Sequence, residues 1–363
     1  MKIGIVTQPL SKNYGGILQN YALQQVLKSL GHTPYTLEVG KFTWVDWIFS
    51  NAKILVKKLL GHKTRFIKFP NTKHKQVSPL RQFVATNIDS IVIANRRLSE
   101  DIVIQNNLGA LIVGSDQVWR PRFNRYITDM FLGFADKLPV KRIAYAASFG
   151  TSQWEYTRRQ TRKCGALAKT FNAISVREDS AVGLCKKYLN VDATHLLDPT
   201  LLLSASEYNK LLNDIPSKGA SLLFAYILDV TEEKIQYVKL YSEKMGLTPI
   251  IKSAGDDIKP DDSIEEWLSY FRDSKYIITD SFHGMVFSII YSKDFLLFPN
   301  AQRGADRFLS LLNTLQINDV IADIQHLDID ISPRNIDWNS VQICLDRQKI
   351  ISKNFIINSL KDI

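Results

Sequence analysis

Residues 2–39 read KIGIVTQPLSKNYGGILQNYALQQVLKSLGHTPYTLEV. The stretch opens with a short apolar run at 3–6, which is typical of a buried strand. A glycine-containing loop follows, and apolar residues then recur with helical spacing up to Gly31, a residue type that is common just after a helix. Residues 33–39 have the composition of a second strand. This strand–helix–strand order predicts a parallel sheet covered by helices.

The same alternation continues nearly to the end of the chain. We expect further strands at 110–113, 142–146, 173–176, 221–227, 248–251, 276–279 and 295–298, and helices at 154–169, 179–188, 231–245, 263–271 and 303–315. The series restarts after Asp198-Pro199-Thr200, and 340–360 has the pattern of a final helix. We therefore predict two Rossmann-like, doubly wound α/β domains with a cleft between them, which is the GT-B arrangement. Their bounds are 1–198 and 199–335, and 336–363 returns as a helix to the first domain.

The positive charge is concentrated in one segment. The chain has 363 residues, with 46 Lys+Arg against 36 Asp+Glu and a formal net charge of +10. The insertion 41–81 contains ten basic residues and one acid, so it carries +9 and the other 322 residues carry +1. A protein that coats nucleic acid usually spreads basic residues over a whole face. General nucleic-acid binding is therefore not expected.

Within this insertion, residues 44–60 have a helical hydrophobic pattern. The apolar side chains fall in one arc, and Lys53, Lys57 and Lys58 lie outside it. Such a helix fits a membrane interface, and the basic residues that follow would attract an anionic leaflet. The pattern predicts docking of 44–75 on an anionic membrane surface. The alternative is an ordinary amphipathic helix that packs on its own domain.

Cysteine usage favours a reducing compartment. Cys164, Cys185 and Cys344 are far apart and form neither a disulfide framework nor a zinc spacing. No signal-peptide pattern opens the chain, and no apolar run approaches the ~18 residues that span a bilayer. We expect a cytoplasmic protein with peripheral attachment to the inner face of the plasma membrane.

Two loops at strand ends carry residues suited to a ligand. Asn13-Tyr14-Gly15-Gly16 allows close approach of the backbone, and the helix behind it favours an anion. Gly114-Ser115-Asp116-Gln117-Val118-Trp119 follows an apolar run, and ligands of parallel sheets bind beyond such strand ends. Its polar side chains suit sugar hydroxyls, and its tryptophan offers a face to a pyranose ring. The alternatives are a tight turn for the first loop and a capped helix start for the second.

A third loop contains a candidate catalytic histidine. Thr279-Asp280-Ser281-Phe282-His283-Gly284 again follows a strand pattern, and a histidine at such a junction suits proton transfer near neutral pH. A lone histidine is more often structural, but the polar neighbours Asp280 and Ser281 favour a functional His283.

Three arginines are candidates for binding an anion. Arg177 follows the expected strand at 173–176, and Arg303 and Arg307 are four residues apart, on one helical face. The planar guanidinium matches the oxygens of carboxylate and phosphate in pairs. For any single arginine, the alternative is a salt bridge to Asp179 or Asp306.

Five motifs occur in a fixed order between about residue 3 and residue 312. They are Asn-Tyr-Gly-Gly-x-Leu-Gln-x-Tyr-Ala-Leu at 13–23, Gly-Ser-Asp-Gln-x-Trp at 114–119, Val-Arg-Glu at 176–178, Asp-Pro-Thr at 198–200 and Asp-Ser-Phe-His-Gly at 280–284. This ordered set resembles the polysaccharide pyruvyl transferases. Members of that family move pyruvate from phosphoenolpyruvate onto a sugar of a surface polysaccharide, forming a cyclic ketal, and their fold resembles GT-B.

The resemblance implies roles for individual residues. Arg177 would hold phosphoenolpyruvate, and His283 would act as the acid at the reacting centre. Asp116 or Asp280 would serve as the base or as the group that orients His283. Several family members carry an arginine where this chain has Ser281, and we expect Arg303 or Arg307, or both, to replace it.

The expected catalytic residues are thus His283, Asp116 and Asp280, and the expected substrate-binding residues are Arg177, Arg303, Arg307, Ser281, Asn13, Gly15, Gly16, Ser115, Gln117 and Trp119. The resemblance implies phosphoenolpyruvate as the donor, bound by the second domain. It implies a galactose-type, lipid-linked acceptor on the first domain, and neither a metal nor another cofactor. The alternatives are a sugar-nucleotide-dependent GT-B glycosyltransferase and a non-catalytic, membrane-associated binding protein with a degenerate site.

Overall fold

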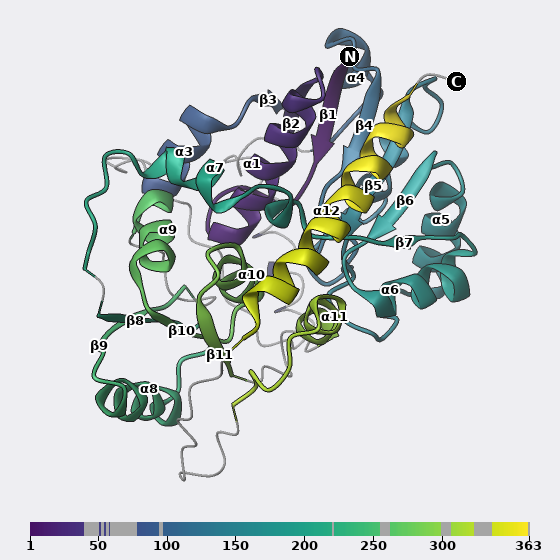
Figure 1. Cartoon of the computed structure of the whole chain (residues 1–363). Helices are drawn as coiled ribbons and strands as arrows, with labels where there is room; N and C mark the ends of the chain where they lie inside the picture. Colours follow the sequence, from purple (N-terminus) through teal and green to yellow (C-terminus); the bar gives the residue numbers. More distant parts are fainter. Residues whose placement is uncertain are drawn as a thin grey trace.

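The computed structural model contains two parallel β-sheets with helices on their faces (Figure 1). One long C-terminal helix runs from the half with the second sheet to the half with the first. The structure describes residues 1–39, 51, 54, 55, 58, 78–93, 97–219, 221–254, 262–298, 306–322 and 336–361. The predicted fold class, two doubly wound α/β units, is confirmed.

The first sheet has seven strands in the order β3-β2-β1-β4-β5-β6-β7. The strands are β1 (Lys2–Val6), β2 (Thr33–Val39), β3 (Ser90–Ile93), β4 (Ala110–Val113), β5 (Lys141–Ala147), β6 (Ala173–Val176) and β7 (Thr194–His195). The chain order reverses between β1 and β4, which pair in parallel with Val6 opposite Val113. At such a switch point the loops after the two strands diverge and leave a crevice that can hold a ligand.

Helix α1 (Tyr14–Ser29) begins at this crevice and is mostly buried. Twelve of its 16 residues are buried, including polar ones that its apolar stripe did not predict. They have partners, since Gln24 Nε2 donates to Thr36 Oγ1 (2.9 Å) and to the Asp89 carbonyl (2.8 Å). Thr36 in turn donates to Asn20 Oδ1 (2.7 Å). These bonds fix α1 against β2, so its N-terminus has a defined position.

Further helices of the first half are α3 (Pro79–Asn87), α4 (Glu100–Gln105), α5 (Arg158–Ala168) and α6 (Asp179–Leu184), which continues into a π turn at Cys185–Leu189. Helix α5 begins at Arg158 instead of the expected 154. The reason is a capping box, in which Thr157 Oγ1 accepts from the Gln160 N–H and Gln160 Oε1 accepts from the Thr157 N–H.

The second sheet has four parallel strands in the order β11-β10-β8-β9. The strands are β8 (Leu222–Tyr226), β9 (Thr248–Lys252), β10 (Tyr276–Thr279) and β11 (Asp294–Leu297), and the helices of this half are α7 (Ala205–Asn209), α8 (Glu232–Lys244), α9 (Ile264–Asp273), α10 (Phe282–Ile290) and α11 (Asp306–Leu315). The chain order reverses between β8 and β10, so the loop from β10 to α10 lies at a second crevice.

The two halves share packed contacts at the start of α1. The Tyr14 ring stacks on Trp267 of α9, with centroids 5.1 Å apart and planes 7° apart. The Tyr14 hydroxyl also donates to the Asp262 carbonyl (2.9 Å). The N-terminus of α1 is therefore anchored in the core of the second half.

Helix α12 (Trp338–Leu360) leads from the second half back across the first (Figure 1, yellow). Its Ser352 Oγ accepts from the Leu197 N–H (3.3 Å), and its Phe355 ring lies 6.3 Å from Tyr145 of β5. The helix thus packs against α11 and against β5 of the first sheet.

Most of the basic insertion 41–81 lies outside the described residues. Asn51, Ile54, Leu55 and Lys58 are described and helical. Arg81 belongs to α3 and pairs with Glu38 at 3.2 Å. Across the described ranges, the structure contains no helix that is both long and apolar enough to span a bilayer.

Candidate active site

Four side chains converge from both halves at the crevice. Asp116 follows β4, Arg177 follows β6, Asp198 lies after β7, and His283 lies in the first turn of α10. Each is at most 8% exposed. The sequence singled out Asp116, Arg177 and His283, but it marked Asp198 only as part of the Asp-Pro-Thr motif and as a domain boundary.

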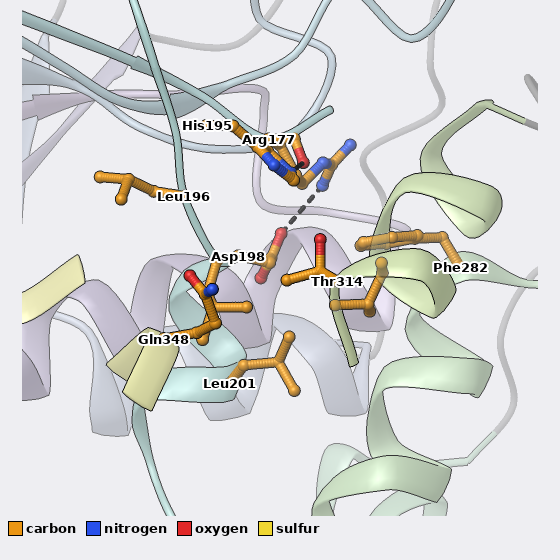
Figure 2. A pocket seen from close by; sticks show the side chains of 10 residues that line it. Arg177, His195, Leu196, Asp198, Leu201, Phe282, Thr314 and Gln348 are labelled. Atoms are coloured by element: carbon orange, nitrogen blue, oxygen red, sulfur yellow. Dashed lines mark hydrogen bonds and ion pairs between the residues drawn. The ribbon is translucent and has the colours of Figure 1, made fainter. Parts of the chain in front are cut away.

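Asp198 is hydrogen-bonded through both carboxylate oxygens. Its Oδ2 accepts from Arg177 Nη1 (Figure 2) and from Ser115 Oγ, each at 2.9 Å. Its Oδ1 accepts from Thr200 N (3.0 Å) and Thr200 Oγ1 (2.7 Å). Burial alone would raise the pKa of Asp198, but His283, Arg177 and the Thr200 N–H outweigh burial and hold that pKa below its usual range. Asp198 is therefore an ionised carboxylate that fixes Arg177.

The guanidinium of Arg177 has unused donors. Its Nη2 lies 3.7 Å from Asp116 Oδ1, which is an ion-pair distance but too long for a hydrogen bond. Its Nε and Nη2 are buried, and neither has a hydrogen-bond partner within the described part of the chain. A buried N–H without a partner costs about 1–3 kcal/mol. These donors are therefore suited to bind an anion.

His283 packs directly on the N-terminus of α1. A Cβ added to Gly15 would lie 2.0 Å from His283 Nδ1, so only glycine leaves room for the imidazole. His283 Nε2 lies 3.8 Å from Asp198 Oδ2, and no described residue forms a hydrogen bond with this nitrogen. The ring is held by packing, and Nε2 remains available for proton exchange with a ligand.

Asp116 adopts a left-handed backbone conformation. Its φ is +71°, which aspartate adopts more readily than most residues but still rarely. The conformation is held by the Asp116 carbonyl, which accepts from Ser148 N (3.1 Å) and Val118 N (2.8 Å). A Cβ added to Gly16 would lie 3.4 Å from Asp116 Oδ2. The carboxylate is thus held between the start of α1 and Arg177.

Glu178 holds Asp116 in place indirectly, through the loop at 148–150, a role that the sequence did not predict. It is fully buried, and its Oε1 accepts from Ser148 Oγ (3.0 Å), Phe149 N (2.8 Å) and Gly150 N (3.0 Å). Glu178 therefore fixes the loop that holds the Asp116 backbone. Its place in the Val-Arg-Glu motif, directly after Arg177, was the available signal.

Arg307 of α11 brings a second buried guanidinium to the site. The Cζ atoms of Arg177 and Arg307 lie 4.7 Å and 5.6 Å from the centroid of the Phe282 ring. Burial, and next the charge of Arg177, lower the pKa of Arg307 to about 10. Two cations crowded in a buried site favour binding of an anion. Arg303, the other expected arginine of this pair, lies outside the described residues.

A link through β7 positions α11 beside Arg177. His195 Nε2 is hydrogen-bonded to the Arg177 carbonyl (3.0 Å) and to Ser310 Oγ (3.1 Å) of α11. Arg177, His195, Asp198, Phe282 and residues of α11 and α12 line one cavity (Figure 2). The strand after Arg177 and the helix that carries Arg307 are thus tied together.

Asp280 does not reach His283, so its expected role as base or orienting group is corrected. Its Oδ1 accepts from Leu228 N (2.6 Å), and its Oδ2 accepts from Asp229 N (3.1 Å) and Lys234 Nζ (2.6 Å). This carboxylate is fully buried and holds the loop between β8 and α8. Ser281 caps α10, because its Oγ accepts from the Gly284 N–H (3.3 Å).

Trp119 also departs from its expected role. It is 0% exposed, its Nε1 donates to the Met130 carbonyl (2.9 Å), and its ring stacks on Phe131 with centroids 4.7 Å apart. A side chain in the core has no face for a sugar ring. Trp119 instead stabilises the segment between β4 and β5.

The remaining expected residues lie around the crevice. Asn13 is exposed just before α1, and its side chain makes no capping bond. Gln117 is partly buried beside Gly150, and its Oε1 accepts from Arg120 Nη1 (2.9 Å). The site therefore combines two guanidiniums, two carboxylates and an imidazole whose Nε2 has no hydrogen-bond partner among the described residues. This combination suits anion binding with proton transfer. Within the described ranges, no three His, Cys, Asp or Glu side chains form a group that could hold a metal ion.

Solved structures similar to this chain share the fold over nearly the whole length. Medicago truncatula UGT71G1 complexed with UDP-glucose has a TM-score of 0.51 and 11% identity, covering 98% of this chain and 97% of that chain. Arabidopsis thaliana UGT89C1 complexed with UDP-L-rhamnose has a TM-score of 0.51 and 10% identity, covering 98% of both chains. The UDP-GlcNAc 2-epimerase of Methanocaldococcus jannaschii has a TM-score of 0.51 and 11% identity, covering 94% and 98%. At these identities the likeness establishes the GT-B fold alone.

Comparison with curated proteins finds no significant match. A family model described as polysaccharide pyruvyl transferase matches residues 13–302, which include all four converging side chains and most of the chain. The match agrees with the ordered motifs in the sequence. The chain belongs to the polysaccharide pyruvyl transferase family.

Proposed function

We propose that the protein transfers a pyruvyl group from phosphoenolpyruvate to two hydroxyls of one galactose-type sugar. The sugar belongs to a lipid-linked precursor of a surface polysaccharide, and the products are a cyclic ketal and phosphate. Arg177 is the observation that carries the proposal. Its Nε and Nη2 are buried donors with no hydrogen-bond partner in the described residues, beside an imidazole nitrogen in the same state. Phosphoenolpyruvate carries the carboxylate and phosphate oxygens that such donors bind.

The charges of the site fit a donor with two anionic groups. Arg177 binds one group, and Arg307 lies close enough to share the Phe282 ring and bind the other. The N-terminus of α1 adds the positive end of its helix dipole next to His283, and no acid occupies its first turn. In this assignment Arg307 supplies the cation that several family members carry at the position of Ser281.

His283 is the proton donor in this mechanism. Its Nε2 protonates the methylene carbon of phosphoenolpyruvate, and the first sugar hydroxyl bonds to the adjacent carbon while its proton passes to Asp116. The second hydroxyl then attacks the same carbon, the carbon–oxygen bond to phosphate breaks, and the second hydroxyl's proton returns to His283. The proton on Asp116 leaves with phosphate, so every charge is restored. A positioned acid of this kind contributes about 10²–10⁴-fold.

Phosphate release from phosphoenolpyruvate, measured with and without a galactose-type acceptor, tests the proposal. We expect release only with the acceptor. His283→Gln should bind phosphoenolpyruvate but turn over about 10²–10⁴-fold more slowly, while Arg347→Gln on the exposed face of α12 should behave as wild type. Near-normal turnover of His283→Gln removes His283 from its role. Consumption of UDP-galactose instead of phosphoenolpyruvate would identify a glycosyltransferase, and no reaction with either would indicate a binding protein.

We propose in addition that residues 44–75 dock on an anionic membrane, where a lipid-linked acceptor is found. The basis is the sequence pattern, an apolar arc with lysines outside it and a dense basic stretch behind it. Flotation with vesicles that contain anionic lipid is the test. Deletion of 44–75 should abolish flotation, and unchanged flotation would reject the assignment.

A further inference from the structure

Residues 120–126, here called the 120–126 loop, carry exposed aromatic and basic side chains that the proposed mechanism does not use. Phe123 is 52% exposed and Tyr126 is 39% exposed. Arg122 and Arg125 beside them are exposed as well. Large aromatic side chains on a loop surface need an explanation when they border a functional site.

The loop is rigidly held by a buried asparagine. Asn124 is 7% exposed, and its Nδ2 donates to the carbonyls of Val118 (2.8 Å) and Arg120 (3.1 Å). Its Oδ1 accepts from Gln8 Nε2 (3.2 Å). The two carbonyl bonds tie Asn124 to the backbone that precedes Phe123, and the third bond ties it to the loop after β1. The exposed ring is therefore preorganised, so a ligand that packs on it needs to order little.

Arginine side chains lie against both aromatic rings, a buried one against Phe123 and a largely exposed one against Tyr126. Arg120 lies 5.2 Å from the Phe123 ring centroid and is only 8% exposed, because its Nη2 and Nε bond to the carboxylate of Glu155 (3.0 and 3.1 Å). Arg97 lies 4.6 Å from the Tyr126 ring centroid. Although Arg120 lies over the ring, Phe123 remains 52% exposed, so part of its apolar surface is open to solvent.

The 120–126 loop borders the active site on the side of the first sheet. Gln8 follows β1, and its Nε2 donates to the Gln117 carbonyl (3.0 Å) after β4. Arg120 Nη1 donates to Gln117 Oε1 (2.9 Å), and Gln117 adjoins Asp116. The loop is thus fixed at the ends of the two strands that form the crevice. A saccharide chain with one sugar bound at Asp116 can extend over this loop.

The basic residues of the loop differ in their pairing. Arg97 pairs with Asp129 (2.8 Å) and Arg120 with Glu155 (3.0 Å). In contrast, no carboxylate among the described residues lies within ion-pair distance of Arg122 or Arg125, which flank Phe123 in the sequence. Arg125 Cζ lies 5.4 Å from the centroid of the Tyr126 ring. An exposed ring that two arginines without a carboxylate partner among the described residues flank in the sequence complements a ligand with an apolar face and a negative charge.

We propose that the 120–126 loop is a binding subsite for an acidic saccharide chain. Phe123 packs against the apolar face of a pyranose ring, and Arg122 and Arg125 bind a carboxylate or phosphate that the same chain carries. This inference rests on the proposed function only in identifying the saccharide chain as the acceptor. The negative charge has two possible sources, an acidic sugar within the chain or the diphosphate of a lipid carrier.

Direct binding without phosphoenolpyruvate tests the subsite. The probes are galactotetraose, tetragalacturonate and a disaccharide linked to geranyl diphosphate, titrated calorimetrically at low and high salt. Wild type should bind both charged probes more tightly than galactotetraose, and the preference should shrink in high salt. Phe123→Ala should weaken all three about tenfold, as expected for loss of an aromatic stacking partner. Arg122→Gln combined with Arg125→Gln should abolish the preference and leave galactotetraose unchanged.

Matched controls lie on the exposed face of α12, where Ile343 is 72% exposed and Arg347 is also exposed. Ile343→Ala and Arg347→Gln should bind all probes as wild type. If the double variant Arg122→Gln, Arg125→Gln loses the preference for tetragalacturonate alone, the charge belongs to an acidic sugar. If it loses the preference for the diphosphate probe alone, the charge belongs to the lipid carrier. Binding by Phe123→Ala equal to wild type, or no binding of any probe by wild type, overturns the subsite.

The same variants separate this inference from the proposed function. If binding depends on Phe123 but no acceptor supports phosphate release from phosphoenolpyruvate, the subsite stands and the proposed function fails. If phosphate release occurs and Phe123→Ala leaves the KM for the acceptor unchanged, the proposed function stands and the subsite fails.

Discussion

Two buried ion pairs, one in each half of the molecule, have opposite hydrogen-bond states. Lys234 and Asp280 satisfy each other and the nearby backbone, because Lys234 Nζ also donates to the Asp229 carbonyl (2.8 Å) and Asp280 accepts two backbone N–H groups. In the Arg177–Asp198 pair the carboxylate is satisfied, but two guanidinium nitrogens have no hydrogen-bond partner among the described residues. We call Lys234–Asp280 the closed pair and Arg177–Asp198 the open pair. The closed pair stabilises the fold, whereas the open pair retains hydrogen-bond donors for a ligand. The following changes test that distinction.

The largest effect is expected from opening the closed pair. Asp280→Asn leaves the Lys234 charge buried without a counter-ion, and breaking a buried pair costs about 3–5 kcal/mol. Calorimetry should show a lowered unfolding temperature, while the KM for phosphoenolpyruvate of the folded protein stays as in wild type. Glu232→Gln on the exposed side of α8 is the matched control and should change neither. A loss of turnover with an unchanged unfolding temperature would show that Asp280 takes part in the reaction.

The open pair should respond in the opposite way. Arg177→Lys keeps a cation beside Asp198 but removes the planar fork, so each lost charge-assisted hydrogen bond to the donor costs about 1.5–3 kcal/mol. The KM for phosphoenolpyruvate should rise by about 100-fold or more, with little change in unfolding temperature. Arg162→Lys, at an exposed position of α5, provides the comparison. An unchanged KM would show that the unused donors of Arg177 do not bind the substrate.

The packing of His283 on α1 gives a third test. In Gly15→Ala the new Cβ would lie 2.0 Å from His283 Nδ1, so the imidazole must move. A displacement of about 1 Å can cost about 10²-fold in rate, and kcat should fall by about 10- to 100-fold with a smaller change in KM. Gly183→Ala is the control, because a Cβ there meets nothing within 4 Å. Equal kcat values for both variants would show that a group other than His283 donates the proton.

The second guanidinium has a smaller expected effect, since Arg177 remains. Arg307→Gln removes one cation from beside Phe282, and the KM for phosphoenolpyruvate should rise about tenfold, the loss of roughly one charge-assisted contact. Arg303→Ala should be measured alongside it. A rise for only one variant identifies the arginine that replaces the one missing at Ser281, and no rise for either rejects the replacement.

Much of this arrangement was predictable from the sequence, because it follows from local patterns. Apolar runs, helical spacing and the breaks at glycine and proline indicated the doubly wound fold. Strand ends located the loops that carry Asp116 and His283, since ligands of parallel sheets bind there. The strands β3 and β7 were missed. Strand β7 has two residues, which are too few for a periodic signal. Strand β3 has four residues, as many as the predicted β4 and β6, so its length does not explain the omission.

The fate of each polar side chain was not predictable, because it depends on distant partners. Asp116 and Asp280 both follow a strand, yet Asp280 is captured by N–H groups at 228 and 229 and by Lys234. Trp119 is buried by a ring at position 131, and Asp198 acquires its role from side chains at 115 and 177. None of these contacts leaves a periodic trace in the sequence.

The smallest effect is expected from acid. The pKa of Asp198 lies below its usual value in the folded protein, so its ionised form adds stability that is complete above the unfolded pKa of about 4 and is lost as pH falls toward the folded pKa. Wild type should therefore lose unfolding temperature as the pH falls below about 4. Asp198→Asn has no carboxylate to protonate at this position, so its unfolding temperature should start lower and fall less. Asp192→Asn, at an exposed position, should follow the wild-type curve. Parallel curves for wild type and Asp198→Asn would mean that the open pair adds no acid-sensitive stability and that Asp198 serves to hold Arg177 in place.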